Sequence, residues 1–151
     1  EAALLAPSSR AIRPWEFIIV QDAALLKKLA EAKSTGGAFL SGAPLAIVVC
    51  ADTEKSDAWI EDASIASTML LLEAEALDLG ACWVQIRNRP HDETKSAAEF
   101  IREVLLLPDR VGVLSVIGIG YPDEVKPPYT KDDLLYGQVH DTQYGKPWPA
   151  P

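Results

Sequence analysis

The apolar positions of the chain form short runs and helical stripes that alternate along the sequence. Four runs are apolar or rich in β-branched residues and have the length of strands, at residues 17–20, 45–50, 81–86 and 111–119. Three longer segments carry apolar residues at helical spacing and predict helices at about residues 23–32, 58–79 and 94–106. The second and fourth runs are apolar without alternation, which is typical of strands covered on both faces.

Polar residues and glycines mark the expected helix ends. Asp22 is placed to cap the first helix, and Ser56 or Asp57 to cap the second. The first turn of the second helix carries Glu61 and Asp62, whose negative charge complements the positive end of the helix dipole. We expect Gly80 to end this helix, Thr94 to start the third one, and Pro108 to follow it.

The second predicted helix is unusually apolar around its circumference. Its three consecutive leucines at residues 70–72 cover about 200°, at about 100° per residue. One face of a sheet cannot bury so wide an arc. Either a partner subunit covers the other side, or the helix is central in a monomer core, and we favour a homodimer.

These elements predict an α+β fold in which helices cover a mostly antiparallel sheet of about four or five strands. With 151 residues, 48% of them hydrophobic, the chain can bury one core, so we expect one domain over residues 1–151. Residues 123–151 are rich in proline and aromatic residues but lack the periodic apolar content to fold alone. We therefore expect this C-terminal tail to be extended and to pack on the partner subunit.

Charge and composition narrow the possible partners. The net charge of −8 argues against non-specific binding to nucleic acid or to an anionic membrane. Cys50 and Cys82 lie in apolar runs, and we expect both to be buried, reduced thiols of a cytoplasmic protein. His91 and His140 have no second ligand at metal-binding spacing, so no metal site is expected, and no Ser-His-Asp arrangement or Gly-rich phosphate loop is identifiable.

Candidate binding chemistry is concentrated just before the first predicted strand. Pro7 and Pro14 restrict the backbone on either side of a short loop. Between and after them lie two hydroxyls, two guanidiniums and one large aromatic ring, on Ser8, Ser9, Arg10, Arg13 and Trp15. This set suits an anionic, planar ligand. The alternative is an ordinary loop with solvated arginines and a buried tryptophan.

Three segments of the chain resemble the nitroreductase family of FMN-dependent, dimeric oxidoreductases. Residues 6–17 read A-P-S-S-x-x-x-R-P-W-E-F and are similar to the family's A-P-S-S-x-N-x-Q-P-W-x-F. Residues 78–84 read D-L-G-A-C-W-V, and residues 120–122 read G-Y-P. Two positions depart from the family: Ala11 stands where the family has Asn, and Arg13 where it usually has Gln.

The resemblance implies a nitroreductase-like three-layer α/β/α fold and a site for FMN. The first segment would bind flavin, often flavin held mainly by the partner subunit. The residues after Gly80 would run along the flavin ring, with backbone groups at its N5 edge, and a basic residue of the tail would pair with the FMN phosphate. The cofactor-binding residues that it implies are Pro7, Ser8, Ser9, Arg10, Arg13, Trp83, Val84, Gln85 and Lys131, with Lys126 as a second choice for the phosphate.

The implied activity is an NAD(P)H oxidoreductase with a ping-pong mechanism. NAD(P)H would reduce the flavin, leave, and be replaced by a nitroaromatic, quinone or related acceptor. Because the flavin carries the hydride, no side chain is assigned as a catalytic acid or base. Family members also carry an Arg-rich phosphate-binding segment that would lie before Glu1 and is not in this sequence.

Two alternatives stay open. One is a dedicated flavin enzyme of the same family, of the dehalogenase or azoline oxidase type. The other is a non-catalytic member that binds a flavin or another ligand, which Ala11 and the absent Arg-rich segment would favour. The sequence does not decide between NADH and NADPH and does not name the electron acceptor.

Overall fold

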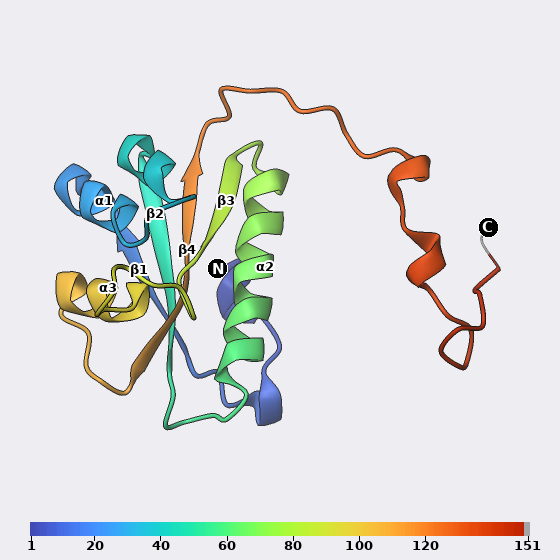
Figure 1. Cartoon of the computed structure of the whole chain (residues 1–151), viewed down its shortest axis with the longest axis horizontal. Helices are drawn as coiled ribbons and strands as arrows, with labels where there is room; N and C mark the ends of the chain where they lie inside the picture. Colours follow the sequence, from blue (N-terminus) through green and yellow to red (C-terminus); the bar gives the residue numbers. More distant parts are fainter. Residues whose placement is uncertain (150–151) are drawn as a thin grey trace.

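A four-stranded antiparallel sheet in the order β1-β2-β4-β3 forms the body of the protein (Figure 1). The structure is a computed structural model and describes residues 1–149. The strands are β1 (Trp15–Val20), β2 (Leu45–Asp52), β3 (Gly80–Gln85) and β4 (Val111–Gly120). The edge strands are therefore β1 and β3, and the inner strands are β2 and β4.

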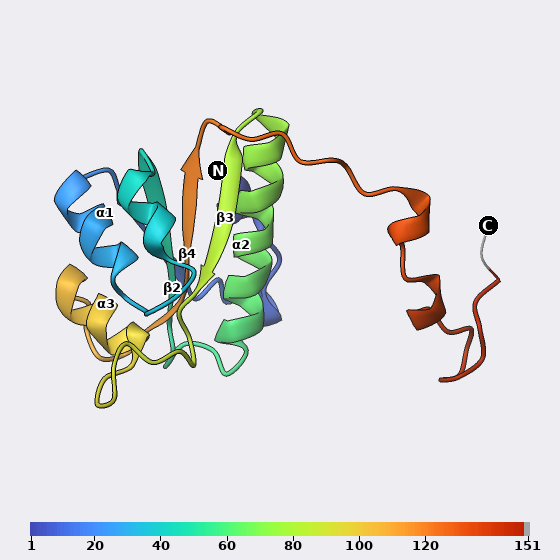
Figure 2. The same ribbon diagram turned by 45° about the horizontal axis from the view of Figure 1, so that its top comes forward.

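Helices cover both faces of this sheet and give the three layers that were predicted (Figures 1 and 2). One face packs against α1 (Ala23–Ala30) and α3 (Ala97–Leu105), and the other against α2 (Trp59–Ala76). Short 3₁₀ turns occur at Ala2–Leu5, Ser9–Ala11, Ala38–Gly42, Lys131–Asp133 and Tyr136–Gln138. Within residues 1–149, no helix combines the length and apolar content needed to cross a bilayer.

The inner strands send apolar side chains to both layers. On the side of α1 and α3, Val48 and Val116 are fully buried, and on the side of α2 so are Val49 and Ile117. Burial on both faces explains why these two strands lack the alternation of a half-exposed strand. The four predicted strands are confirmed, each with bounds within three residues of the expected ones.

The observed ends of α1 and α2 agree only in part with the ends predicted from the sequence. Asp22 caps α1 as predicted, because its Oδ1 accepts the Leu25 N–H at 2.8 Å. The N-cap of α2 is Ala58, which makes no side-chain capping bond. The helix ends at Ala76 rather than at Gly80, and Asp78 takes the left-handed conformation, with φ of 57°.

The predicted start of α3 at Thr94 was wrong. The backbone N–H and the hydroxyl of Thr94 both donate to Asp92 Oδ1, at 2.7 and 2.9 Å, which holds Thr94 in the preceding loop. The helix begins at Ala97 after a capping box, in which Ser96 and Glu99 exchange hydrogen bonds between side chain and backbone. The stronger cap lies two residues further along the chain than the expected one.

The two cysteines differ in environment. Cys50 is fully buried in β2, and burial raises the pKa of its thiol to about 12. Cys82 is exposed, so the prediction that it is buried was wrong. Cys82 and Val84 point to the same face of the edge strand β3. Val84 is buried there, whereas Cys82 is exposed.

The C-terminal tail leaves the end of β4 and extends away from the body (Figures 1 and 2). Its large apolar and aromatic side chains are mostly exposed, including Tyr121, Val125, Tyr129 and Tyr144. A tail of this composition has no core of its own.

Gly118 in β4 makes room for two side chains of the Ala38–Gly42 turn. A Cβ at position 118 would lie 2.6 Å from Phe39 Cε2 and 2.8 Å from Leu40 Cδ2, and Leu40 is fully buried. We expect Gly118→Ala to lower the free energy of unfolding by about 1–3 kcal/mol through overpacking, as measured by urea unfolding.

The matched control is Gly42→Ala, because a Cβ at position 42 would meet no atom within 4 Å. This variant should change the free energy of unfolding by less than about 1 kcal/mol. Equal stability of the two variants would contradict the packing described for Gly118.

Candidate functional site

A buried carboxylate fixes the loop at residues 7–14 to the start of α2. Asp62 is 2% exposed, and its Oδ1 accepts the Ser9 N–H at 2.7 Å. The hydroxyl of Ser56 donates to Asp62 Oδ2 at 3.3 Å. The sequence suggested that Asp62 only complements the helix dipole, but the carboxylate points inward and holds the candidate loop. The sequence held one clue to this contact: an acidic residue in the first turn of a helix can accept hydrogen bonds from free N–H groups of a nearby loop.

The loop itself has an unusual backbone. Arg10, Ala11 and Arg13 have φ of 51°, 55° and 53°, although none of them is glycine. Non-glycine residues are uncommon in this left-handed region, and such strain is concentrated at ligand sites and switches. The hydroxyl oxygen of Ser8 accepts the Arg13 N–H at 3.0 Å and stabilises the turn. The expectation of a stiff loop therefore has a structural basis in these contacts.

The two arginines of the loop point outward. Arg10 Nη2 lies 2.6 Å from Asp57 Oδ1, and both side chains are largely exposed. Such an exposed pair is worth at most about 1 kcal/mol, so it can exchange for a ligand anion at small cost. Arg13 is exposed beside it.

The backbone of Asp52 supports the far end of the loop, where β1 begins. The Asp52 N–H donates to the Pro14 carbonyl at 2.9 Å. Burial alone would raise the pKa of Asp52. The Glu54 N–H at 3.1 Å, Arg110 Nε at 3.2 Å and Lys55 Nζ at 3.6 Å outweigh burial and hold that pKa below its usual value.

The second group of candidate residues lies in β3. Trp83 and Gln85 face the α2 layer, where the Trp83 ring packs in the apolar cluster of that side. Val84 faces the opposite layer and is 1% exposed, so its side chain is committed to the core. Only the backbone of Val84 can meet a ligand. Because β3 is an edge strand, half of its backbone groups point away from the sheet and are open to one.

The lysines proposed for the phosphate both lie in the tail. Lys131 begins the Lys131–Asp133 turn and is exposed. Lys126 Nζ lies 2.8 Å from Glu124 Oε1, and this hydrogen bond raises the pKa of Lys126. The Lys131–Asp133 turn lies in the part of the tail that extends away from the body (Figure 1). Lys126 lies nearer to the body, close enough to β3 for Cys82 to contribute to its raised pKa.

The candidate residues of the body therefore form two groups at opposite edges of one sheet. The loop at residues 7–14 leads into β1, at one edge, whereas Trp83 and Gln85 belong to β3, at the other edge. Strands β2 and β4 lie between the two groups within one chain.

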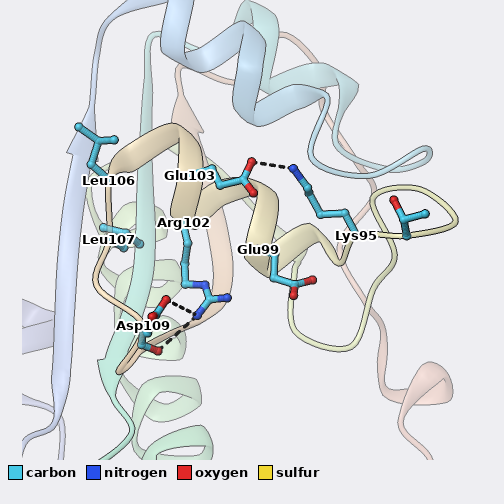
Figure 3. A pocket seen from close by; sticks show the side chains of 8 residues that line it. Lys95, Glu99, Arg102, Glu103, Leu106, Leu107 and Asp109 are labelled. Atoms are coloured by element: carbon cyan, nitrogen blue, oxygen red, sulfur yellow. Dashed lines mark hydrogen bonds and ion pairs between the residues drawn. The ribbon is translucent and has the colours of Figure 1, made fainter.

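A pocket of the described residues lies elsewhere, beside α3 (Figure 3). Its charged side chains are paired with each other: Lys95 Nζ lies 2.6 Å from Glu103 Oε2, and Arg102 Nη1 lies 3.6 Å from Asp109 Oδ1. None of the candidate cofactor residues lines it. We conclude that this pocket is not the candidate site. In residues 1–149, no three His, Cys, Asp or Glu side chains are grouped so that they could hold a metal ion.

The nitroreductase family model matches residues 32–121 of this chain. The chain belongs to the nitroreductase family. A protein of Archaeoglobus fulgidus with the provisional name NADH dehydrogenase/NAD(P)H nitroreductase is 42% identical over 137 residues, which are 88% of this chain and 75% of that protein. The family predicted from three short segments is therefore confirmed.

Solved structures of this nitroreductase family have the same fold. An FMN-dependent nitroreductase from Clostridium difficile R20291 is 50% identical, with a TM-score of 0.94 over 95% of this chain and 83% of that chain. The NADPH:FMN oxidoreductase from Vibrio harveyi, solved in complex with NAD⁺, is 27% identical, with a TM-score of 0.73 over 96% of this chain and 66% of that one. The predicted nitroreductase fold is confirmed, and the assignment of individual cofactor residues stays a prediction.

Replacing Asp62 tests the attachment of the loop. Asp62→Ala leaves the Ser9 N–H and the Ser56 hydroxyl without their acceptor, so we expect the free energy of unfolding to fall by about 1–3 kcal/mol. Asp57→Ala is the control, because it removes only the exposed pair with Arg10 and should cost less than about 1 kcal/mol. Urea unfolding compares the two variants, and a smaller loss for Asp62→Ala than for Asp57→Ala would refute the anchor.

Acid titration tests the environment of Asp52. Its pKa is lower in the folded than in the unfolded chain, so its carboxylate stabilises the fold above the unfolded-state pKa of about 4. This stability is lost as the pH falls through the lower, folded-state pKa. We expect Asp52→Asn to be less stable at neutral pH and to lose less stability below about pH 4, as followed by the urea midpoint against pH. Parallel curves for the variant and the wild type would contradict this account.

Proposed function

We propose that this chain is an FMN-dependent oxidoreductase that takes electrons from NAD(P)H and passes them to a small-molecule acceptor, in alternating steps. The observation that carries the proposal is the 50% identity and TM-score of 0.94 to the FMN-dependent nitroreductase over 95% of the chain. Nitroaromatic compounds, quinones and related acceptors are the class of substrate we infer. Bound FMN would accept a hydride and supply the redox chemistry.

The residues of the chain fit an anionic, planar cofactor. At residues 7–14, two hydroxyls and two guanidiniums lie on a backbone that Asp62 and the Ser8–Arg13 hydrogen bond hold in place. In β3, the open backbone edge at residues 83–85 would lie along the ring, and a backbone N–H there would stabilise the reduced form without a competing acid. Lys131 would reach the phosphate from the tail.

The separation of the two groups supports a homodimer with shared sites. Because the loop and β3 lie at opposite edges of one sheet, we infer that each flavin meets β3 of one subunit and the loop of its partner. Apolar side chains remain exposed on α2 and just after it, with Ile65, Leu72 and the C-cap residue Leu77 each at least 40% exposed. A second subunit and its tail would cover these side chains and the aromatic residues of the first tail.

The departure at Ala11 does not favour a non-catalytic protein. Ala11 has φ of 55°, in the region that Asn adopts more readily than Ala. The family's Asn at this position is thus suited to the backbone conformation, and Ala11 keeps that conformation. We therefore retain the catalytic function as our proposal.

Purification of the full chain tests the proposal directly. We expect FMN to co-purify, or to bind when added, at about one per subunit, which follows from one β3 edge per chain. Addition of NADH or NADPH under anaerobic conditions should bleach the flavin absorbance, and a quinone should restore it. Colourless protein that takes up no FMN would overturn the proposal. Bound FMN that dithionite reduces but NAD(P)H does not would point to binding without turnover.

A further inference from the structure

A chain of two hydrogen bonds runs along one side of β3. The indole Nε1–H of Trp83 donates to Gln85 Oε1 at 2.9 Å, and Gln85 Nε2 donates to the carbonyl oxygen of Arg87 at 2.9 Å. An indole can only donate and a backbone carbonyl can only accept. The two partners therefore fix which way the Gln85 amide points.

This arrangement ties Trp83 to the end of the strand. Gln85 is the last paired residue of β3, opposite Ser115 of β4, and Arg87 lies beyond the ladder. The amide of Gln85 thus connects an aromatic ring within the strand to the backbone just after it. All the contacts are local, so the arrangement holds in each subunit by itself.

The Trp83 ring depends on this contact for its orientation. The ring is half-buried against the apolar cluster on the α2 side, against which Leu71 and Leu79 also pack. Apolar packing is not directional, whereas the indole N–H needs an acceptor when it leaves water. Gln85 supplies that acceptor, and so selects one rotation of the ring.

We propose that Gln85 is a positioning residue, which orients the Trp83 ring as the wall of the flavin site and has no direct contact with the flavin. This inference rests on the proposed function, in which the flavin ring lies along residues 83–85. It separates two side chains that the resemblance treated alike. Trp83 meets the cofactor, and Gln85 acts through Trp83.

A double-mutant cycle tests this role. The variants are Gln85→Leu, which keeps the size but loses both hydrogen bonds, Trp83→Phe, which loses the donor, and the double variant. FMN affinity of the full chain is measured by quenching of flavin fluorescence. We expect Gln85→Leu to raise the Kd about three- to tenfold, the effect of losing one hydrogen bond, and to change it less than about twofold in the Trp83→Phe background.

A second variant and a second measurement keep the test valid if Gln85→Leu misfolds. Gln85→Met also removes the amide and should behave like Gln85→Leu. In ¹⁵N-labelled protein without FMN, the indole N–H resonance that disappears in Trp83→Phe should shift in both Gln85 variants and exchange faster with solvent.

The outcomes separate the two proposals. An equal loss of FMN affinity in both backgrounds would show that Gln85 touches the flavin and overturn the positioning role alone. An unchanged FMN affinity in Gln85→Leu and Gln85→Met would also overturn the positioning role, because the flavin site would then not depend on Gln85. A wild-type chain that binds no FMN would overturn the proposed function and this inference together, although the indole resonance would still report the contact between Trp83 and Gln85.

Discussion

The contact between the Asp62 carboxylate and the Ser9 N–H is the constraint on which the candidate site depends. A carboxylate that is 2% exposed is costly unless donors surround it, and here a backbone N–H and a hydroxyl donate to its two oxygens. The same contact joins the strained loop to the rigid α2. Three left-handed residues can persist there because their surroundings over-determine the backbone.

The sheet order explains why the site is divided. Because β2 and β4 are the two inner strands, they separate the loop before β1 from the residues of β3. Within one chain, the two groups of candidate residues thus lie at opposite edges of the sheet. Exposed apolar side chains remain on α2 and on the tail, and a second subunit would cover them in the dimer that we propose.

Much of the fold could be predicted from local patterns, because the inner strands are buried on both faces and read as unbroken apolar runs. Predictions failed where the sequence did not show which partner or neighbour a side chain would have. Thr94 could cap a helix but bonds to Asp92 instead, and Cys82 looks like a core residue until β3 is known to be an edge strand. The order of motif residues pointed to two candidate segments, and their part in cofactor binding stays a prediction. The inward direction of Asp62 and the opposite directions of Trp83 and Val84 appear only once the sheet and α2 are in place.

The position of β4 also has a consequence for synthesis on the ribosome. This strand is the last of the four in the sequence, yet it pairs with both β2 and β3. Until it emerges, only β1 and β2 can pair, and β3 has no neighbour at all. From the synthesis of β2 until β4 emerges, the nascent chain therefore keeps an unpaired, apolar strand edge, which makes it prone to aggregation.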